Sequence, residues 1–189
     1  MPKPFEPMVP GFIRIAPGDI EGLNSLTSQK DIVAGLVEPV QGEGGVRPLA
    51  REYLGAWRSL CDQQNWLLMF DEVQTGNGRC GALYAYQRLG VTPDVLTTAK
   101  GLGNGYPIGA CLAKGEASSA LRAGDHGTTY GGSPLACAAA SAVVNTLADP
   151  HLLARADVIR DHILKAFGDH LANPAHVVEI RGLGLMLGI

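Results

Sequence analysis

Apolar and polar positions along the chain fall into strand-length runs separated by helix-length patterns. Residues 32–37 form a nearly continuous apolar run, which predicts a strand buried on both faces. Further apolar runs predict strands at 66–70, 94–97 and 108–113. After Pro48, where a helix could begin, apolar side chains recur at helical spacing. These side chains are Tyr53, Leu54, Trp57, Leu60 and Cys61.

A short helix at 82–89 completes an order of strand, helix, strand, helix, strand. This order predicts an α/β fold with a mostly parallel sheet and flanking helices. In such sheets a ligand binds beyond the carboxyl ends of the strands. Glu38, Asp71 and Lys100 each follow a predicted strand, so we expect all three at that edge.

The last third of the chain changes to a helical pattern. Residues 134–147 are rich in small side chains and predict a closely packed helix. Residues 151–171 carry one apolar stripe and predict a second helix, after which 177–180 and 183–189 predict a hairpin. We therefore divide the chain into a larger unit at 1–149 and a linking helix with the start of a smaller α+β unit at 150–189.

Composition narrows the functional classes. The 189 residues are enough for one domain with a sizeable core. The net charge is −3 and no basic run occurs, so neither nucleic acid nor an anionic membrane is an expected partner. The apolar runs are far too short to span a bilayer. The four cysteines lack metal-ligand spacing, which favours reduced thiols in a cytoplasmic protein without a metal site.

Lys100 and Asp71 together indicate a particular chemistry. A lysine amine can form an imine with the aldehyde of pyridoxal 5'-phosphate (PLP), and a carboxylate can hold the pyridine nitrogen protonated. Taken singly, Asp71 could be a strand-end or helix-capping acid and Lys100 an ordinary surface lysine. The glycines at 101, 103 and 105 favour the ligand interpretation, because they leave room for a bulky group beside Lys100.

Three neighbouring features fit the same cofactor, each with a simpler alternative. Gln74 could donate to the phenolate oxygen of the ring, and Val73 could pack on the ring face or merely in the core. Glu43 could be a surface acid or a charged gate at the substrate end. The segment 126–132 could bind a phosphate ahead of the helix at 134, although Ser133 as a plain N-cap explains it equally well.

Together these segments resemble the class III (ornithine-type) PLP-dependent aminotransferases. The matching segments are 38–46, 70–76 with Gly78 and Arg79, 97–102, 107–110, 126–132, 134–137 and 181–184. The resemblance runs in order over nearly the whole chain. It implies part of the large domain of the fold type I PLP transferases, followed by the start of their small C-terminal domain.

The resemblance also implies roles for individual residues. Lys100 would carry the cofactor and Asp71 would pair with its ring nitrogen. Val73 would lie against the ring and Gln74 near its hydroxyl oxygen. Thr129 would reach the cofactor phosphate of a neighbouring subunit, since the active sites of this family form at a homodimer interface.

Glu43 resembles the glutamate that pairs with an arginine while a basic substrate is bound and releases it for glutamate. The implied reaction transfers an ω-amino group to 2-oxoglutarate, giving a semialdehyde and glutamate. Residues 74–76 and 126–129 favour N-acetylornithine as the donor, with succinylornithine and ornithine close to it. Members that act on γ-aminobutyrate or glutamate semialdehyde are the alternative within the family.

A different alternative is a non-catalytic, truncated remnant of such an enzyme. The phosphate cup, the ring-stacking aromatic residue and the substrate-binding arginines of the family have no counterpart in these residues. Phosphate and packing contacts supply much of cofactor affinity, so we expect the chain alone to bind PLP weakly.

Overall fold

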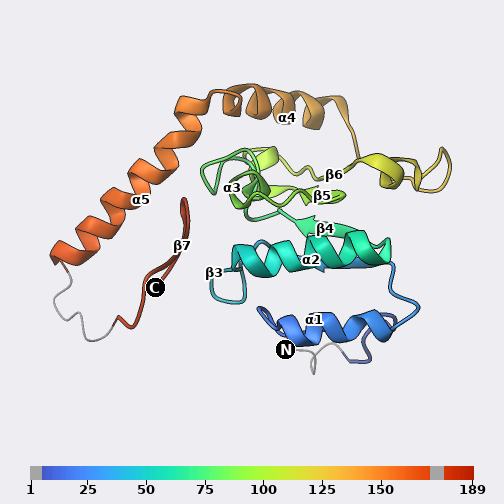
Figure 1. Ribbon diagram of the computed structural model, residues 1–189. Helices are drawn as coiled ribbons and strands as arrows, with labels where there is room; N and C mark the ends of the chain where they lie inside the picture. The colour runs from blue at the N-terminus through green and yellow to red at the C-terminus, as the bar shows by residue number, and fades with distance from the viewer. Residues whose placement is uncertain (1–5, 171–176) are drawn as a thin grey trace.

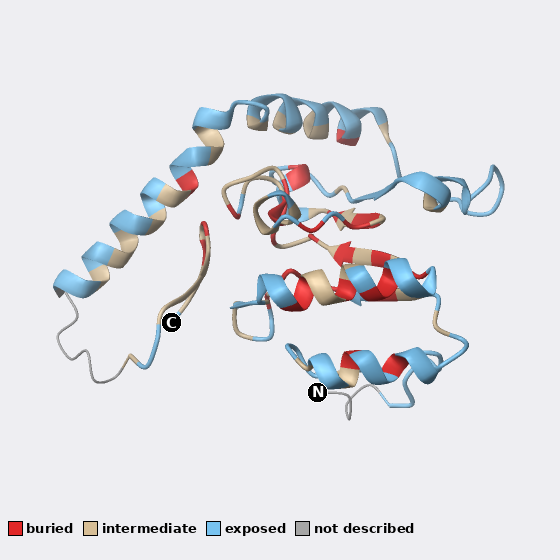
Figure 2. Cartoon of the chain, viewed as in Figure 1, coloured by how far each residue is buried: buried red, intermediate tan, exposed pale blue. Residues whose placement is uncertain are grey.

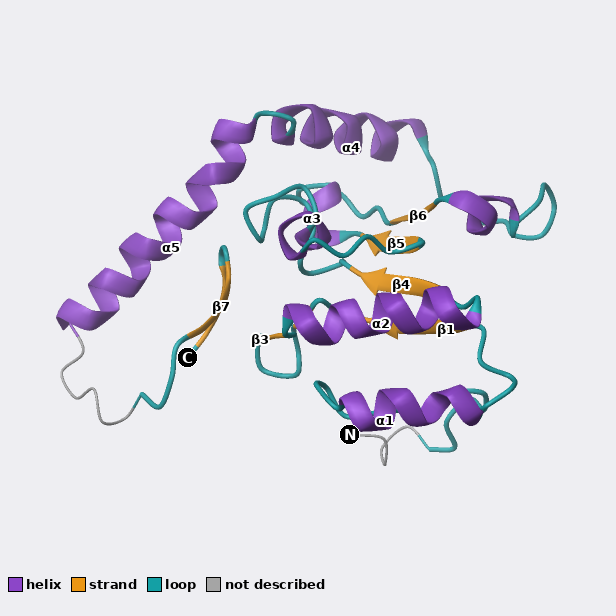
Figure 3. Cartoon of the chain, viewed as in Figure 1, coloured by secondary structure: helices purple, strands orange, loops and turns teal. Residues whose placement is uncertain are grey.

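The computed structural model describes residues 6–170 and 177–189. Its centre is a four-stranded sheet in the order β1-β4-β5-β6 (Figures 1 and 3). The strands are β1 (Ala34–Val37), β4 (Leu67–Asp71), β5 (Val95–Thr98) and β6 (Ala110–Ala113). The first three are parallel and β6 is antiparallel to β5, which confirms the predicted mostly parallel α/β sheet.

The register of the sheet aligns the carboxyl ends of its two inner strands. Val37 of β1 lies opposite Phe70 of β4, and Asp71 of β4 lies opposite Thr97 of β5. The backbone N–H of Glu72 still donates to the Thr97 carbonyl at 2.9 Å, so the pairing continues one residue past β4. The residues that follow β4 and β5 therefore emerge side by side.

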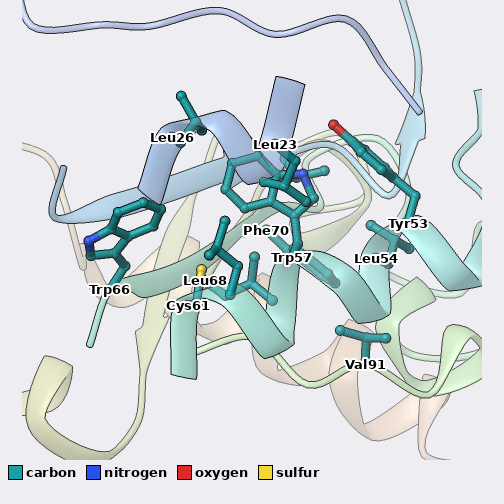
Figure 4. Close-up of a cluster of buried hydrophobic side chains, with 12 residues drawn as sticks. Leu23, Leu26, Tyr53, Leu54, Trp57, Cys61, Trp66, Leu68, Phe70 and Val91 are labelled. Atoms are coloured by element: carbon teal, nitrogen blue, oxygen red, sulfur yellow. The ribbon is translucent and has the colours of Figure 1, made fainter. Parts of the chain in front are cut away.

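On one face of the sheet α2 (Arg51–Gln64) packs against β1 and β4, and α1 (Ile20–Ser25) with the short 3-10 helix η2 (Leu26–Ser28) packs beside α2 (Figure 1). Asp19 caps α1 by accepting from the Gly22 N–H at 2.8 Å. Figure 4 shows the resulting core, in which buried side chains of α1, α2 and β4 meet. It includes Leu23, Tyr53, Leu54, Trp57, Cys61, Leu68 and Phe70.

Two expectations about this half of the chain are wrong. Residues 32–37 are not buried on both faces: Val33 is 75% exposed and Leu36 is 61% exposed. Within β1 alternate side chains point to opposite faces, so Leu36 points away from the face on which Gly35 and Val37 are buried. Val33 lies just before the strand. Pro48 does not begin the helix either, because β3 (Arg47–Pro48) pairs with β2 (Val40–Gln41) in a small hairpin and α2 starts at Arg51.

The second half contains α3 (Ala85–Leu89), α4 (Pro134–Leu147), α5 (Pro150–His170) and the hairpin of β7 (Arg181–Leu183) and β8 (Met186–Gly188). Both long helices were expected, but α4 is mostly exposed instead of closely packed (Figure 2). Its one buried side chain is Ala136. The hairpin turns at Gly184 instead of at 181–182, and residue 171 of the predicted helix lies outside the described residues.

Two short 3-10 helices complete the chain, η3 (Lys100–Leu102) after β5 and η4 (Gly115–Ser119) after β6. Helix α4 contacts η3, and α5 is tied to the end of α3 by an ion pair of Asp157 with Arg88 at 2.9 Å. Within residues 6–170 and 177–189, no helix is both long and apolar enough to cross a membrane.

Candidate active site

Asp71 ends β4 at the edge of the sheet where β5 also ends. Its Oδ1 accepts a hydrogen bond from the Val73 N–H at 3.0 Å, which fixes the half-buried carboxylate against the first turn of the following loop. A carboxylate held in this way keeps one oxygen for another partner. The position agrees with the sheet edge expected from the sequence.

A cavity of about 330 Å³ opens at the same edge. Its walls come from the loop after β4, the turn after β5 and the C-terminal hairpin. The lining residues are Val73, Gln74, Gly76, Asn77, Arg79, Lys100, Gly101, Leu185, Met186 and Leu187. Of the residues singled out from the sequence, Val73, Gln74 and Lys100 line this cavity. Asp71 is not among the lining residues and is connected to them by its hydrogen bond to the Val73 N–H.

Lys100 forms the first residue of η3, directly after β5. Its φ of +44° is in the left-handed region, which costs a residue with a Cβ roughly 1–2 kcal/mol. The residue is exposed. The strained turn thus holds the lysine at the cavity wall with its amine open to solvent.

Glu43 approaches the cavity through Gln74. The Nε2 of Gln74 donates to Oε1 of Glu43 at 3.3 Å, joining the loop after β2 to the loop after β4. Gly42 lies beside this contact, and a Cβ there would displace the amide of the Gln74 side chain. Glu38 supports the same loop by accepting from the Gly42 N–H at 2.9 Å.

Thr129 lies apart from these residues. It sits in an exposed segment ahead of α4 and does not line the cavity of the described chain. Its expected contact is with a second subunit, so that role stays a prediction. Ser133 takes the N-cap position with Pro134 at N1, but its hydroxyl makes no capping bond within the described residues.

Glu72 has a structural role that the sequence argument missed. It is fully buried and accepts hydrogen bonds from the Thr75 hydroxyl at 2.9 Å and from the N–H groups of Ala85 and Tyr86 at the start of α3. Burial raises the pKa of the Glu72 carboxyl, although the three donors oppose that rise. An Asp-Glu pair after a strand should have suggested it, since successive side chains point to opposite faces.

The C-terminal hairpin is the second element that the sequence argument did not connect to the site. Gly184 turns with φ of +56° directly over Cys80, and the Leu185 N–H donates to the Arg79 carbonyl at 2.9 Å. This docking brings residues 185–187 to the cavity. In the described part of the chain no cluster of His, Cys, Asp or Glu has the geometry of a metal site.

Comparison with known proteins defines the class of protein. The family model described as "Aminotransferase class-III" matches residues 1–189, so the chain belongs to the class III aminotransferases.

Individual relatives narrow the comparison. The acetylornithine aminotransferase of Agrobacterium fabrum is 48% identical over 191 residues, which cover 98% of this chain and 46% of that protein. The succinylornithine transaminase of Yersinia pseudotuberculosis is 48% identical over 170 residues, covering 87% of this chain and 41% of that protein. The chain thus spans less than half the length of these relatives.

Solved structures agree with the fold. An ornithine aminotransferase of Toxoplasma gondii, in whose structure PLP partially occupies the active site, superimposes with a TM-score of 0.87 at 38% identity. The match covers 96% of this chain and 43% of that one.

Proposed function

We propose that this protein takes part in PLP-dependent transamination of an ω-amino group, with N-acetylornithine as donor and 2-oxoglutarate as acceptor. The observation that carries the proposal is the meeting of Lys100, Val73 and Gln74 around one cavity beside Asp71. The names of its relatives support an ornithine derivative as the amino donor, because these relatives are acetylornithine, succinylornithine and ornithine aminotransferases. Succinylornithine and ornithine are therefore the competing donors.

The residues present fit the ring end of PLP. The cavity of about 330 Å³ falls at the lower end of the range for small-molecule sites. Its walls offer a primary amine, an amide donor and an apolar branched side chain, with a carboxylate next to them. When bound, the pyridine ring of PLP withdraws electrons from the substrate carbon that loses its proton.

The chain's own residues have separate tasks in this proposal. The amine of Lys100 would hold the cofactor, and its Nζ would serve as the base that takes the proton from the substrate carbon. The Asp71 carboxylate would keep the ring nitrogen protonated. Gln74 would donate one N–H to the ring hydroxyl oxygen and keep the other for Glu43, and Val73 would pack on the ring face.

Glu43 is proposed to gate the substrate end. Its bond to Gln74 is long and solvent-exposed, so the carboxylate can leave it for a cationic partner at little cost. Thr129 is proposed to bind the cofactor phosphate of a second subunit in a homodimer. The division into a cofactor-binding unit at 1–149 and the start of a small domain at 150–189 is likewise a proposal.

Reduction with borohydride tests the assignment of Lys100, because it fixes PLP to the amine with which it has condensed. We expect peptide mass spectrometry to find the label mainly on Lys100, and to find it lost in Lys100→Ala but kept in Lys114→Ala. Equal labelling of exposed lysines would overturn the assignment. Glutamate formation from 2-oxoglutarate and a panel of ω-amino donors then identifies the substrate, and labelling without turnover would identify a non-catalytic remnant.

A further inference from the structure

Asn77 connects the two loops that form the cavity. It lies in the loop after β4, and its Nδ2 donates to the Thr98 hydroxyl at 2.8 Å and to the Ala99 carbonyl at 3.0 Å. Thr98 ends β5 and Ala99 immediately precedes Lys100. The amide group of Asn77 therefore donates one hydrogen bond to each of the two residues that precede Lys100.

The backbone at this point needs such support. Lys100 adopts φ of +44°, in the left-handed region. A strained conformation of this kind persists only where its surroundings impose it. The Ala99 carbonyl also accepts from the Leu102 N–H at 2.9 Å, so Asn77 holds the same oxygen that closes η3.

The rest of the Asn77 side chain faces the site. Asn77 lines the cavity together with Lys100, and its Cβ packs against Gly101, where an added Cβ would lie 3.0 Å away. Its Oδ1 is buried and has no hydrogen-bond partner among the described residues. Buried polar atoms without a partner are rare in native proteins.

We propose that Asn77 is a positioning residue for Lys100, fixing the turn that carries the amine through its bonds to Thr98 and Ala99. This inference rests on the proposed role of Lys100 as the residue that takes the cofactor. Asn77 itself does not need to touch the cofactor.

The chain offers a matched pair of variants for the test. Asn77 has φ of +55°, which glycine adopts freely, so Asn77→Gly removes the side-chain bonds without straining the loop. Asn65 also has φ of +55° but caps α2 away from the cavity, so Asn65→Gly is the control. Thr98→Val removes one of the two acceptors and should produce part of the effect.

The first measurement needs no cofactor. Hydrogen–deuterium exchange at residues 100–103 should become about tenfold faster in Asn77→Gly, as expected for the loss of two hydrogen bonds. Asn65→Gly should leave exchange in this segment unchanged. Unchanged exchange in Asn77→Gly, or equal acceleration in both variants, would overturn the proposal.

The second measurement uses PLP and borohydride on the same proteins. The ratio of labelling at Lys100 to labelling at the exposed Lys114 should fall about tenfold in Asn77→Gly. A general loss of stability would affect both lysines, so the ratio isolates positioning. If wild-type Lys100 takes no label, the proposed function fails; if it does and Asn77→Gly has the wild-type ratio, only the role of Asn77 fails.

Discussion

Arg181 donates two hydrogen bonds to the carbonyl oxygen of Gly45, from Nε at 2.8 Å and from Nη2 at 2.6 Å. Its third nitrogen, Nη1, pairs with Glu179 on its own segment. The guanidinium therefore joins the start of β7 to the loop that follows β2. This loop carries Glu43, so one side chain links the C-terminal hairpin to the proposed substrate gate.

Arg181→Lys should loosen this link although the charge is kept. Lysine cannot reproduce the planar fork, so we expect a loss of about 1–2 kcal/mol in the free energy of unfolding. Denaturant titration measures the loss, and hydrogen–deuterium exchange should rise at residues 42–48. Arg47→Lys is the control, because Arg47 is exposed and makes only a local bond to Gly44 at 3.2 Å. Equal losses of unfolding free energy in the two variants would show that the paired hydrogen bonds of the Arg181 guanidinium do not stabilise the fold.

Gly184→Ala should push the hairpin away from the cavity. A Cβ at Gly184 would lie 2.7 Å from Cys80 Cα and 2.6 Å from Cys80 C, at a backbone φ of +56°. Gly90→Ala provides the comparison, since it shares a positive φ of +73° but meets nothing within 4 Å. We expect about 1 kcal/mol of destabilisation in Gly90→Ala from backbone strain alone, and at least about 2 kcal/mol in Gly184→Ala. Thermal or denaturant unfolding of both variants gives the difference.

Glu72→Gln should reveal the pH dependence of the buried carboxyl. Its pKa in the folded chain is raised above the ordinary 4.5, so the native state holds the proton more tightly than the unfolded chain. The contribution of this group is therefore complete below about pH 4.5 and declines as pH rises through the folded pKa. The difference in unfolding free energy between wild type and Glu72→Gln, followed from pH 4 upward, should fall accordingly. A difference that grows with pH would contradict this assignment.

The amide variant carries a second cost. Its NH₂ group would face one of the donors that now reach the carboxylate, from Thr75, Ala85 or Tyr86. A buried donor left without an acceptor costs about 1–3 kcal/mol. We thus expect Glu72→Gln to be less stable than wild type at low pH, and local exchange to rise at the start of α3.

Lys100 should itself limit the stability of the cofactor-free chain. At φ of +44° glycine relieves strain that alanine retains, so Lys100→Gly should be more stable than Lys100→Ala by about 1 kcal/mol. At Lys114, where φ is −128°, the order should reverse, because glycine there only adds freedom to the unfolded chain. Denaturant unfolding of the four cofactor-free variants measures both differences in unfolding free energy.

The sequence predicted what depends on local pattern. The order of strands and helices and the parallel sheet followed from apolar periodicity, and the placement of Asp71 and Lys100 followed from their position after strands. What the pattern missed depends on tertiary contacts. The exposure of Leu36 reflects how much of the sheet the helices cover, and the link from Arg181 to Gly45 joins residues far apart in the chain.

Asn77 shows the same limit on a smaller scale. Its neighbours Gly76 and Gly78 indicate a turn and nothing more. The hydrogen bonds of Asn77 to Thr98 and Ala99 form because the loops after β4 and β5 are adjacent in the fold. Alternation places the side chain of Glu72 opposite that of Asp71, but its hydrogen bonds to Ala85 and Tyr86 depend on where α3 begins. The hydrogen-bond partners of both residues lie on elements that only the folded chain brings next to them.

The short stretch between Asp71 and Lys100 also bears on how the molecule assembles. β4 and β5 are neighbours in the sheet and are separated in the sequence only by α3 and short loops, so bringing them together closes only a small loop. Small loops close quickly compared with the joining of distant segments. We therefore expect the turn that carries Lys100 to form with this unit before the hairpin of β7 and β8 completes the cavity wall.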